Sequence, residues 1–179
     1  IFLSAVHAEL LVQEAAKCIL SCLRKKQPLV SLLLIPHARN SNMSDPTRFV
    51  DSSNMIVEEL PWGPHAWLCR PDIVEAEKLL MVRVRMPPGK GHAFHRHPEM
   101  EEIIYIEEGT AEQWVDREKK LLGPGESAHI PMDVVHGTYN AGDSTLVFLA
   151  ILSPAKIEGP PLIEMQDEEP WKSLRDAVT

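Results

Sequence analysis

Two histidines, His95 and His97, stand two residues apart in a segment with the composition of a β-strand, and Glu102 follows five residues later. Because side chains alternate across a strand, we expect the two imidazoles on the same face. A third histidine, His136, lies further along in a Val-containing segment bounded by turn residues. Three imidazoles and one carboxylate form a ligand set suited to a divalent transition metal, so these residue types predict a metal site.

Short apolar segments separated by Gly and Pro follow each other from about residue 55. Such segments predict β-strands joined by turns, and many of them at regular spacing predict an all-β sandwich or barrel. The last predicted strand is apolar on both faces, which is typical of a strand buried between two layers. A short helix is predicted within residues 168–175. The main predicted strands are residues 79–86, 111–116, 127–130, 134–140 and 145–152.

The spacing around the candidate ligands resembles the two sequence motifs of the cupin superfamily. The first motif is matched by Gly89-x5-His95-x-His97-x4-Glu102-x6-Gly109. The second is matched by Gly125-x5-Pro131-x-Asp133-x2-His136-x3-Asn140. Asp133 stands where the second motif usually has glycine. Since Asp tolerates left-handed backbone geometry better than most residues, we expect this turn to survive.

The resemblance implies an all-β fold, the double-stranded β-helix or jelly-roll barrel, with its core at about residues 79–153 inside a cupin domain at 43–179. It also implies one divalent metal ion inside the barrel. The identity of the metal stays open among Fe, Mn, Ni, Zn, Co and Cu, because mixed nitrogen and oxygen ligands suit all of them. The implied ligands are the four residues that ligand type and spacing also select: His95, His97, Glu102 and His136.

Proteins of that family include dioxygenases, decarboxylases and sugar isomerases, so the resemblance implies several reactions. We expect a metal-dependent, dioxygenase-type oxidoreductase acting on a small oxygenated organic molecule, such as an aromatic or keto compound. Isomerisation of a sugar or sugar phosphate is an alternative, weakened because the sequence shows no inward basic cluster. A non-catalytic cupin that binds a small molecule is the other alternative. The sequence identifies no catalytic residue apart from the metal ligands.

Residues 1–42 differ in charge from the rest of the chain. They hold five basic and two acidic residues, whereas the remainder holds 13 basic and 24 acidic ones. One interpretation is a targeting peptide, because such signals are basic and poor in acids. We favour a mis-assigned start or a disordered N-terminal extension, because the chain begins with Ile and residues 43–48, Met-Ser-Asp-Pro-Thr-Arg, resemble an ordinary protein start.

The formal charge of −8 argues against nucleic acid and against an anionic membrane surface as partners. No apolar run approaches the roughly 20 residues that span a bilayer, so we expect no membrane contact. Cys18, Cys22 and Cys69 show no metal-ligand spacing, which favours a reducing compartment and a cytoplasmic location. A homodimer is expected, because an open sandwich has sheet edges to protect.

Other residues near the motifs have two interpretations each. His92 could line the mouth of the site, but its Gly-flanked position favours a solvated turn histidine. For His129, an orientation towards the cavity and an orientation towards the outside are equally expected. Arg83 and Arg85 share a strand whose other face is apolar, so we expect both to point outwards. The aromatic-rich segment 61–67 forms a lid over the pocket, a partner-binding edge or, as we prefer, a segment that packs against the barrel wall.

Overall fold

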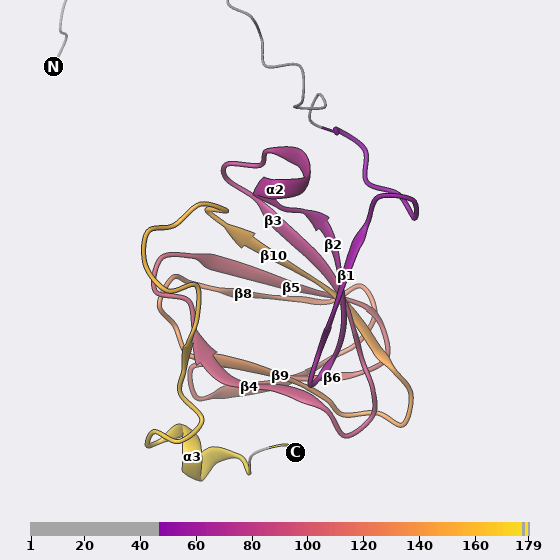
Figure 1. The fold of residues 1–179 in the computed structure, drawn as a ribbon. Coiled ribbons are helices and arrows are strands. Elements are labelled where there is room, and N and C mark those ends of the chain that lie inside the picture. The colour runs from indigo at the N-terminus through magenta and orange to yellow at the C-terminus, as the bar shows by residue number, and fades with distance from the viewer. Residues whose placement is uncertain (1–46, 177, 179) are drawn as a thin grey trace, which may run out of the picture. The chain divides into compact units, whose positions relative to one another are not determined.

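Two antiparallel β-sheets face each other in the computed structural model, which describes residues 47–176 and 178 (Figure 1). The arrangement confirms the predicted all-β jelly-roll fold. Residues 43–179 form one compact unit by their own contacts. The expectations for residues 1–42, an extension or a mis-assigned start, lie outside the described residues.

The first sheet has six strands and carries most of the apolar residues that face the interior. Its central strand, β10, pairs with β3 on one side and β5 on the other. In spatial order the strands are β1 (Ile56–Leu60), β2 (Gly63–Cys69), β3 (Leu80–Met86), β10 (Leu146–Ser153), β5 (Glu101–Glu108) and β8 (Ser127–Ile130).

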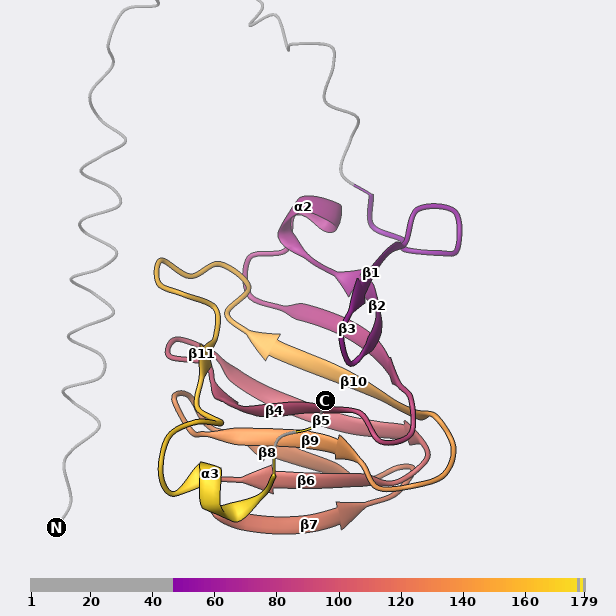
Figure 2. The ribbon, with the colours of Figure 1, turned by 60° about the horizontal axis from the view of Figure 1, so that its bottom comes forward.

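The second sheet has five strands and brings the two sequence motifs together, because β4 pairs with β9. Figure 2 shows this sheet with the C-terminal helix α3 (Trp171–Leu174) beside it. The other described helix, the single turn α2 (Pro71–Val74), follows β2. In spatial order the strands are β11 (Ile163–Glu164), β4 (Gly91–Arg96), β9 (His136–Asn140), β6 (Ala111–Val115) and β7 (Glu118–Leu122).

The predicted strands agree with the observed ones to within two residues at each end, and the predicted C-terminal helix is present as the single turn α3. The predicted full burial of the last strand is wrong for its outer face. Val147 is buried, but Leu149 and Ile151 are only half-buried. The cause is visible on neighbouring β5, where Ile103 and Tyr105 are about 40% exposed, since no second layer among the described residues covers this face of the sheet.

The apolar core has two parts. The larger lies between the sheets and contains fully buried side chains of β3, β5 and β10, such as Val84, Ile106 and Leu146. The smaller lies on the outer face of the second sheet, where Trp171 of α3 packs with aromatic residues of β4, β6 and β9. Phe94 meets the ring of Trp114 edge to face, with their centroids 5.6 Å apart. The C-terminal segment therefore leaves the inner face of this sheet free for the polar residues of the motifs.

Two turns of the motifs depend on left-handed backbone geometry. Asp133 has φ of 64°, so the residue that replaces the usual motif glycine adopts the left-handed conformation, as predicted. Its backbone N–H donates to the carbonyl of His97 over 2.9 Å and ties the second motif to the first. Gly109 has φ of 83°, and a Cβ there would lie 3.0 Å from the Cα of Leu146, so only glycine fits without strain.

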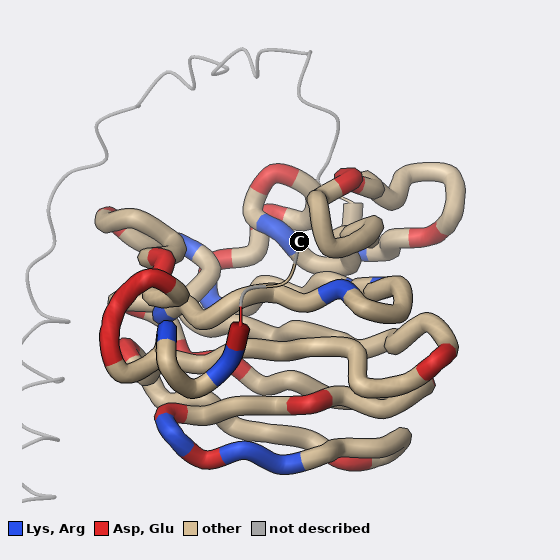
Figure 3. The backbone as a smooth tube through the Cα atoms, turned by 90° about the horizontal axis from the view of Figure 1, so that it is seen from below, with Lys and Arg blue, Asp and Glu red and all other residues tan. Residues whose placement is uncertain are grey.

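Charged residues gather at loops and hairpin ends. Acidic and basic residues alternate along the hairpin between β6 and β7, where residues 116–120 run Asp-Arg-Glu-Lys-Lys (Figure 3). Residues 118–120 are exposed, as expected for a hairpin tip. Among the described residues, no helix has both the length and the apolar character needed to cross a bilayer.

Truncation of Ile106 to Ala is expected to lower the free energy of unfolding by about 2–5 kcal/mol, because the change leaves a cavity in the core between the sheets. Urea unfolding followed by circular dichroism measures the loss. Leu121→Ala is the control, since Leu121 is 59% exposed and should shift stability by only about 0.5 kcal/mol. Equal effects of the two variants would contradict this assignment of the core.

Candidate metal centre

The four predicted ligands meet at one end of the space between the sheets. His95 lies in β4, His97 directly follows that strand, Glu102 lies in β5, and His136 begins β9. Each side chain is buried, with at most 8% of the residue exposed. One potential ligand atom from each residue lies within 4.8 Å of the others. The geometry is therefore that of a coordination group contributed by both sheets.

Backbone carbonyls fix the orientation of all three imidazoles in the same way. The Nδ1 atom of His95 lies 2.7 Å from the carbonyl of Ala93, and that of His136 lies 3.0 Å from the carbonyl of Val134. The Nδ1 atom of His97 lies 2.6 Å from the carbonyl of Pro161. A carbonyl oxygen only accepts, so each Nδ1 carries the hydrogen and donates it. Each Nε2 is then unprotonated and carries a free lone pair. This is the tautomer that a metal ligand needs.

Two of these lone pairs, those of His97 and His136, lie against a carboxylate, which is itself only an acceptor. Glu102 Oε2 lies 2.8 Å from Nε2 of His136 and 3.4 Å from Nε2 of His97. The 2.8 Å contact does not have hydrogen-bond geometry. Neither Nε2 of His136 nor Oε2 of Glu102 has a hydrogen-bond partner among the described residues. Facing acceptors that close repel each other unless a cation lies among them. Three imidazoles and one carboxylate therefore fit a divalent transition metal.

The pKa values of the ligands follow from burial and from one another. Burial raises the pKa of Glu102, but a proton on the adjacent His136 or His97 outweighs burial and lowers this pKa to about 2, so the carboxylate stays ionised. Burial and the neighbouring imidazoles hold the pKa of His95 well below its ordinary 6.5. Burial also lowers the pKa of His97, yet the Glu102 carboxylate outweighs it and raises this pKa above 6.5. His97 thus takes up a proton more readily than His95.

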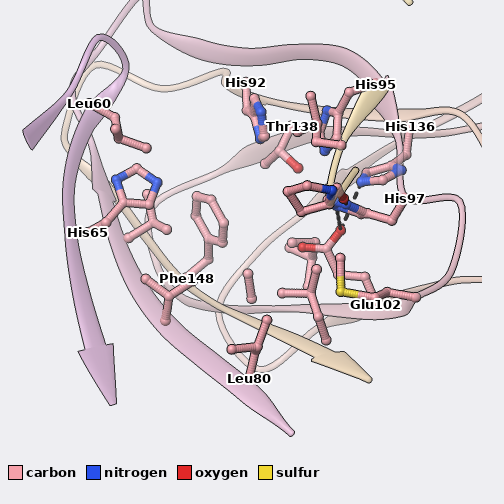
Figure 4. A pocket seen from close by; sticks show the side chains of 18 of the residues that line it. Leu60, His65, Leu80, His92, His95, His97, Glu102, His136, Thr138 and Phe148 are labelled. Atoms are coloured by element: carbon pink, nitrogen blue, oxygen red, sulfur yellow. Dashed lines mark hydrogen bonds and ion pairs between the residues drawn. The ribbon is translucent and has the colours of Figure 1, made fainter. Parts of the chain in front are cut away.

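A pocket of about 340 Å³ opens beside the ligands and is mostly apolar (Figure 4). Its wall includes Trp67 of β2, Val82 of β3, Ile104 of β5 and Phe148 of β10. The polar side chains besides the ligands are two histidines and one threonine, and none of the described lining residues is Lys or Arg. The volume is at the small end of the roughly 300–1,000 Å³ typical of small-molecule sites.

His92 lies in this pocket, and the prediction of a solvated turn histidine is wrong. Its ring stacks on that of His95, with centroids 3.8 Å apart and planes at 25°. The reason is a β-bulge in β4. His92 pairs with Thr138 and His95 with His136, so two residues of β4 oppose one of β9, and the regular alternation of faces is interrupted. Desolvation lowers the pKa of His92 to about 3, which keeps it neutral.

The aromatic segment that begins β2 forms part of the pocket wall. Trp62 stacks on His92, with centroids 4.2 Å apart, and Trp67 lines the pocket further along the strand. His65, between them, is 3% exposed and also lines the pocket. Sequence reasoning did not single out His65. The available signal was its position two residues before Trp67, which places both side chains on one face of a strand.

The remaining candidates point away from the site. His129 is exposed and lies 3.2 Å from the carboxylate of Glu101 on the neighbouring strand. Arg83 and Arg85 face outwards, as predicted, and Arg83 donates to Glu107 over 2.6 Å. None of these three residues lines the pocket that holds the ligands.

Comparison with known proteins identifies the family. A family model described as a cupin domain matches residues 82–152. The polyketide synthase CurC of Streptomyces cyaneus is 32% identical over 107 residues, which cover 60% of this chain and 70% of CurC. The chain belongs to the cupin superfamily. Both motifs of this cupin contribute to the group of four side chains.

Other similar proteins are less identical to this cupin, and the matches differ in how much of each chain they cover. Mannose-1-phosphate guanylyltransferase ManC of Salmonella typhimurium is 29% identical over 108 residues, 60% of this chain. The chain spans about a fifth of that protein, since the match covers 21% of it. An RmlC-like cupin from Shewanella frigidimarina superposes with a TM-score of 0.54 at 23% identity, covering 64% of this chain and 96% of that one. The last likeness supports the fold alone.

Replacing His97 or His136 by Ala is expected to abolish metal retention while the barrel stays folded. Loss of an outer-shell partner alone costs roughly 10–100-fold in metal affinity, and loss of a ligand should exceed this. Elemental analysis of purified protein measures retention, and circular dichroism checks the fold. His129→Ala is the matched control, because this histidine is exposed and outside the pocket. Unchanged metal content in both ligand variants would refute the site.

Metal retention is also expected to weaken as pH falls through the raised pKa of His97, which lies above 6.5. The sign follows from the ligand state, because a metal binds neutral imidazole and each added proton competes with it. His95 stays neutral to lower pH and does not limit binding in this range. Competition with a chromogenic chelator from about pH 8 to about pH 5 measures the effect. Constant affinity over that range would contradict it.

Proposed function

We propose that this cupin is a metal-dependent enzyme acting on a small, largely apolar, oxygenated organic molecule, and that the reaction is of the dioxygenase type. The observation that carries the proposal is the position of a four-donor group at one end of an apolar pocket. The group fits one divalent ion from among Fe, Mn, Ni, Zn, Co and Cu. When bound, such an ion supplies Lewis-acid polarisation of a substrate oxygen and, for a redox-active metal, access to O₂ chemistry.

The residues of the chain set the charge at that end of the pocket. Three neutral imidazoles and the Glu102 carboxylate together carry −1, so a divalent ion would leave the group at +1. An anionic or enolised oxygen is favoured beside a net positive charge in an apolar surrounding. The low pKa of Glu102 keeps the carboxylate ionised over the whole physiological range. These residues therefore suit a substrate that presents a carbonyl, enol or phenol oxygen to them.

The pocket wall selects the rest of the substrate. Its side chains are mainly aliphatic and aromatic, so an apolar body is accommodated by burial of its surface. A phosphate would need cationic or N–H partners, and no Lys or Arg is among the described lining residues. This contrast favours an aromatic or keto compound over a sugar phosphate.

Isomerisation of a sugar or sugar phosphate is the second candidate. It is supported by the likeness to ManC, whose name specifies a sugar phosphate. That match covers only about a fifth of ManC, and the apolar lining of this pocket weighs against it. A cupin that binds a small molecule without converting it is the remaining alternative.

Protein reconstituted with Fe(II) is expected to take up O₂ in the presence of a small aromatic or keto substrate. An oxygen electrode, with a panel of diketones, flavonols and sugar phosphates, measures uptake for each of the six metals. His136→Ala should reduce uptake by more than about 100-fold, because it removes a ligand. His129→Ala should leave it unchanged. Absence of O₂ uptake with every metal, together with tight binding of an unmodified ligand, would overturn the oxygenase proposal.

The homodimer and the cytoplasmic location stay predictions. Sedimentation equilibrium of the full chain tests the oligomeric state directly.

A further inference from the structure

His65 carries a buried nitrogen that the metal centre does not use. The residue is 3% exposed, and its Nε2 atom has no hydrogen-bond partner among the described residues. A buried polar group is normally paired, and an unpaired one costs free energy, so the exceptions often mark functional positions. His65 lines the same pocket as the four ligands.

The hairpin between β1 and β2 fixes the state of this ring. Nδ1 of His65 lies 2.8 Å from the carbonyl of Gly63 and must donate to it, because a carbonyl oxygen only accepts. Gly63 holds that carbonyl in place with φ of 128°, and a Cβ there would lie 2.1 Å from the carbonyl oxygen of Arg85. Burial lowers the pKa of His65, so the ring is neutral and Nε2 carries a free lone pair.

The ring stands across the pocket from the metal centre. Figure 4 shows His65 on one side and His97, Glu102 and His136 on the other, with Phe148 drawn between them. One ring nitrogen of His65 is on the side that faces the pocket (Figure 4). Trp62 meets the ring edge to face, with centroids 4.0 Å apart, and restricts its rotation. The pocket therefore has polar groups at both ends, with Phe148 between them on one side and His92 and Thr138 on the other (Figure 4).

We infer that Nε2 of His65 accepts a hydrogen bond from a hydroxyl at the end of the substrate remote from the metal. The substrate class is thereby narrowed to an apolar body with a metal-binding oxygen group at one end and a hydrogen-bond donor at the other. His65 is a specificity-determining residue in this scheme, and the inference rests on the proposed function.

The selectivity follows from the cost of leaving the lone pair unpaired. A ligand with a donor at this position pairs with Nε2, whereas an analogue without it buries the same nitrogen against an apolar surface. Sites built to bind a hydroxyl discriminate strongly against analogues that lack it, because a buried polar group is then left without a partner. An ether at the same position is also rejected, since it offers an acceptor to an acceptor.

Aryl hydroxamates are suitable probes, because a hydroxamate binds a divalent metal through two oxygens and leaves the aryl group to enter the pocket. The probes are benzohydroxamate and 2-naphthohydroxamate, each unsubstituted, with a distal hydroxyl, and with a distal methoxy group. Calorimetry with metal-loaded protein gives their affinities. The hydroxyl that reaches His65 should tighten binding roughly threefold to tenfold, and methoxy should not.

Two variants test whether His65 is the acceptor. His65→Phe should remove the gain from the hydroxyl and should bind the unsubstituted probes at least as tightly as the wild type, because no lone pair is then left unpaired. His65→Gln, which keeps a carbonyl acceptor, should restore part of the gain. A hydroxyl gain that is absent in the wild type, or that survives in His65→Phe, would overturn the inference. If no probe binds metal-loaded protein at all, the proposed metal site for substrate fails, and this inference fails with it.

A second readout does not depend on affinity. In the ¹⁵N spectrum of the imidazoles, Nε2 of His65 should be unprotonated in the free protein. Its resonance should shift when a hydroxylated probe binds and not when the unsubstituted probe binds. A protonated Nε2 in the free protein would contradict its assignment as an acceptor, whereas a merely structural histidine would respond equally to both probes.

Discussion

The metal centre depends on the lone pairs of three imidazoles, which backbone hydrogen bonds hold close together. Three backbone carbonyls take the Nδ1 hydrogens of His95, His97 and His136, and each ring is thereby left with an unprotonated Nε2. Those of His97 and His136 lie against the Glu102 carboxylate. Such an arrangement is unfavourable by itself in an apolar barrel and becomes favourable when a cation joins the donors. The fold supplies the constraint, because two of the carbonyls lie two residues before the histidines they orient and the third comes from a loop 64 residues away from its histidine.

The rest of the structure can be understood as support for that constraint. The aromatic cluster around Phe94 and Trp171 holds β4 and β9 from outside, so their inner faces carry polar residues without weakening the sheet. The first sheet provides a mainly apolar wall opposite, and its Glu102 is the one acid among the described residues that line the pocket. The loop after β10 adds the carbonyl of Pro161, which orients His97 from a distant part of the sequence. Both sheets therefore contribute to the metal site, whereas the apolar lining comes mainly from the first sheet.

The fold and the group of four side chains were predictable because they depend on short-range patterns. Strand alternation placed Arg83 and Arg85 outside, and the structure agrees. The pocket residues were harder to predict, since the direction of their side chains depends on irregularities in the strands. The prediction for His92 was wrong because a β-bulge turns its side chain towards the pocket, and a single sequence carries no clear sign of a bulge. The tautomer-fixing contact of His97 with Pro161 joins residues 64 apart and leaves no local trace.

The bulge in β4 lets two histidines that are three residues apart share the inner face of that strand. His95 pairs with His136 and His92 pairs with Thr138, and the bulge takes up the extra residue between them. Loss of a single residue at 93–94 would leave His92 and His95 two residues apart, which regular alternation keeps on the same face. In a lineage of such proteins, the loss of one residue at this point would therefore change the outer face of the strand, where Phe94 packs, before it changed the pocket. Deletions, which usually reverse the faces of a strand, would here leave its inner face as it is.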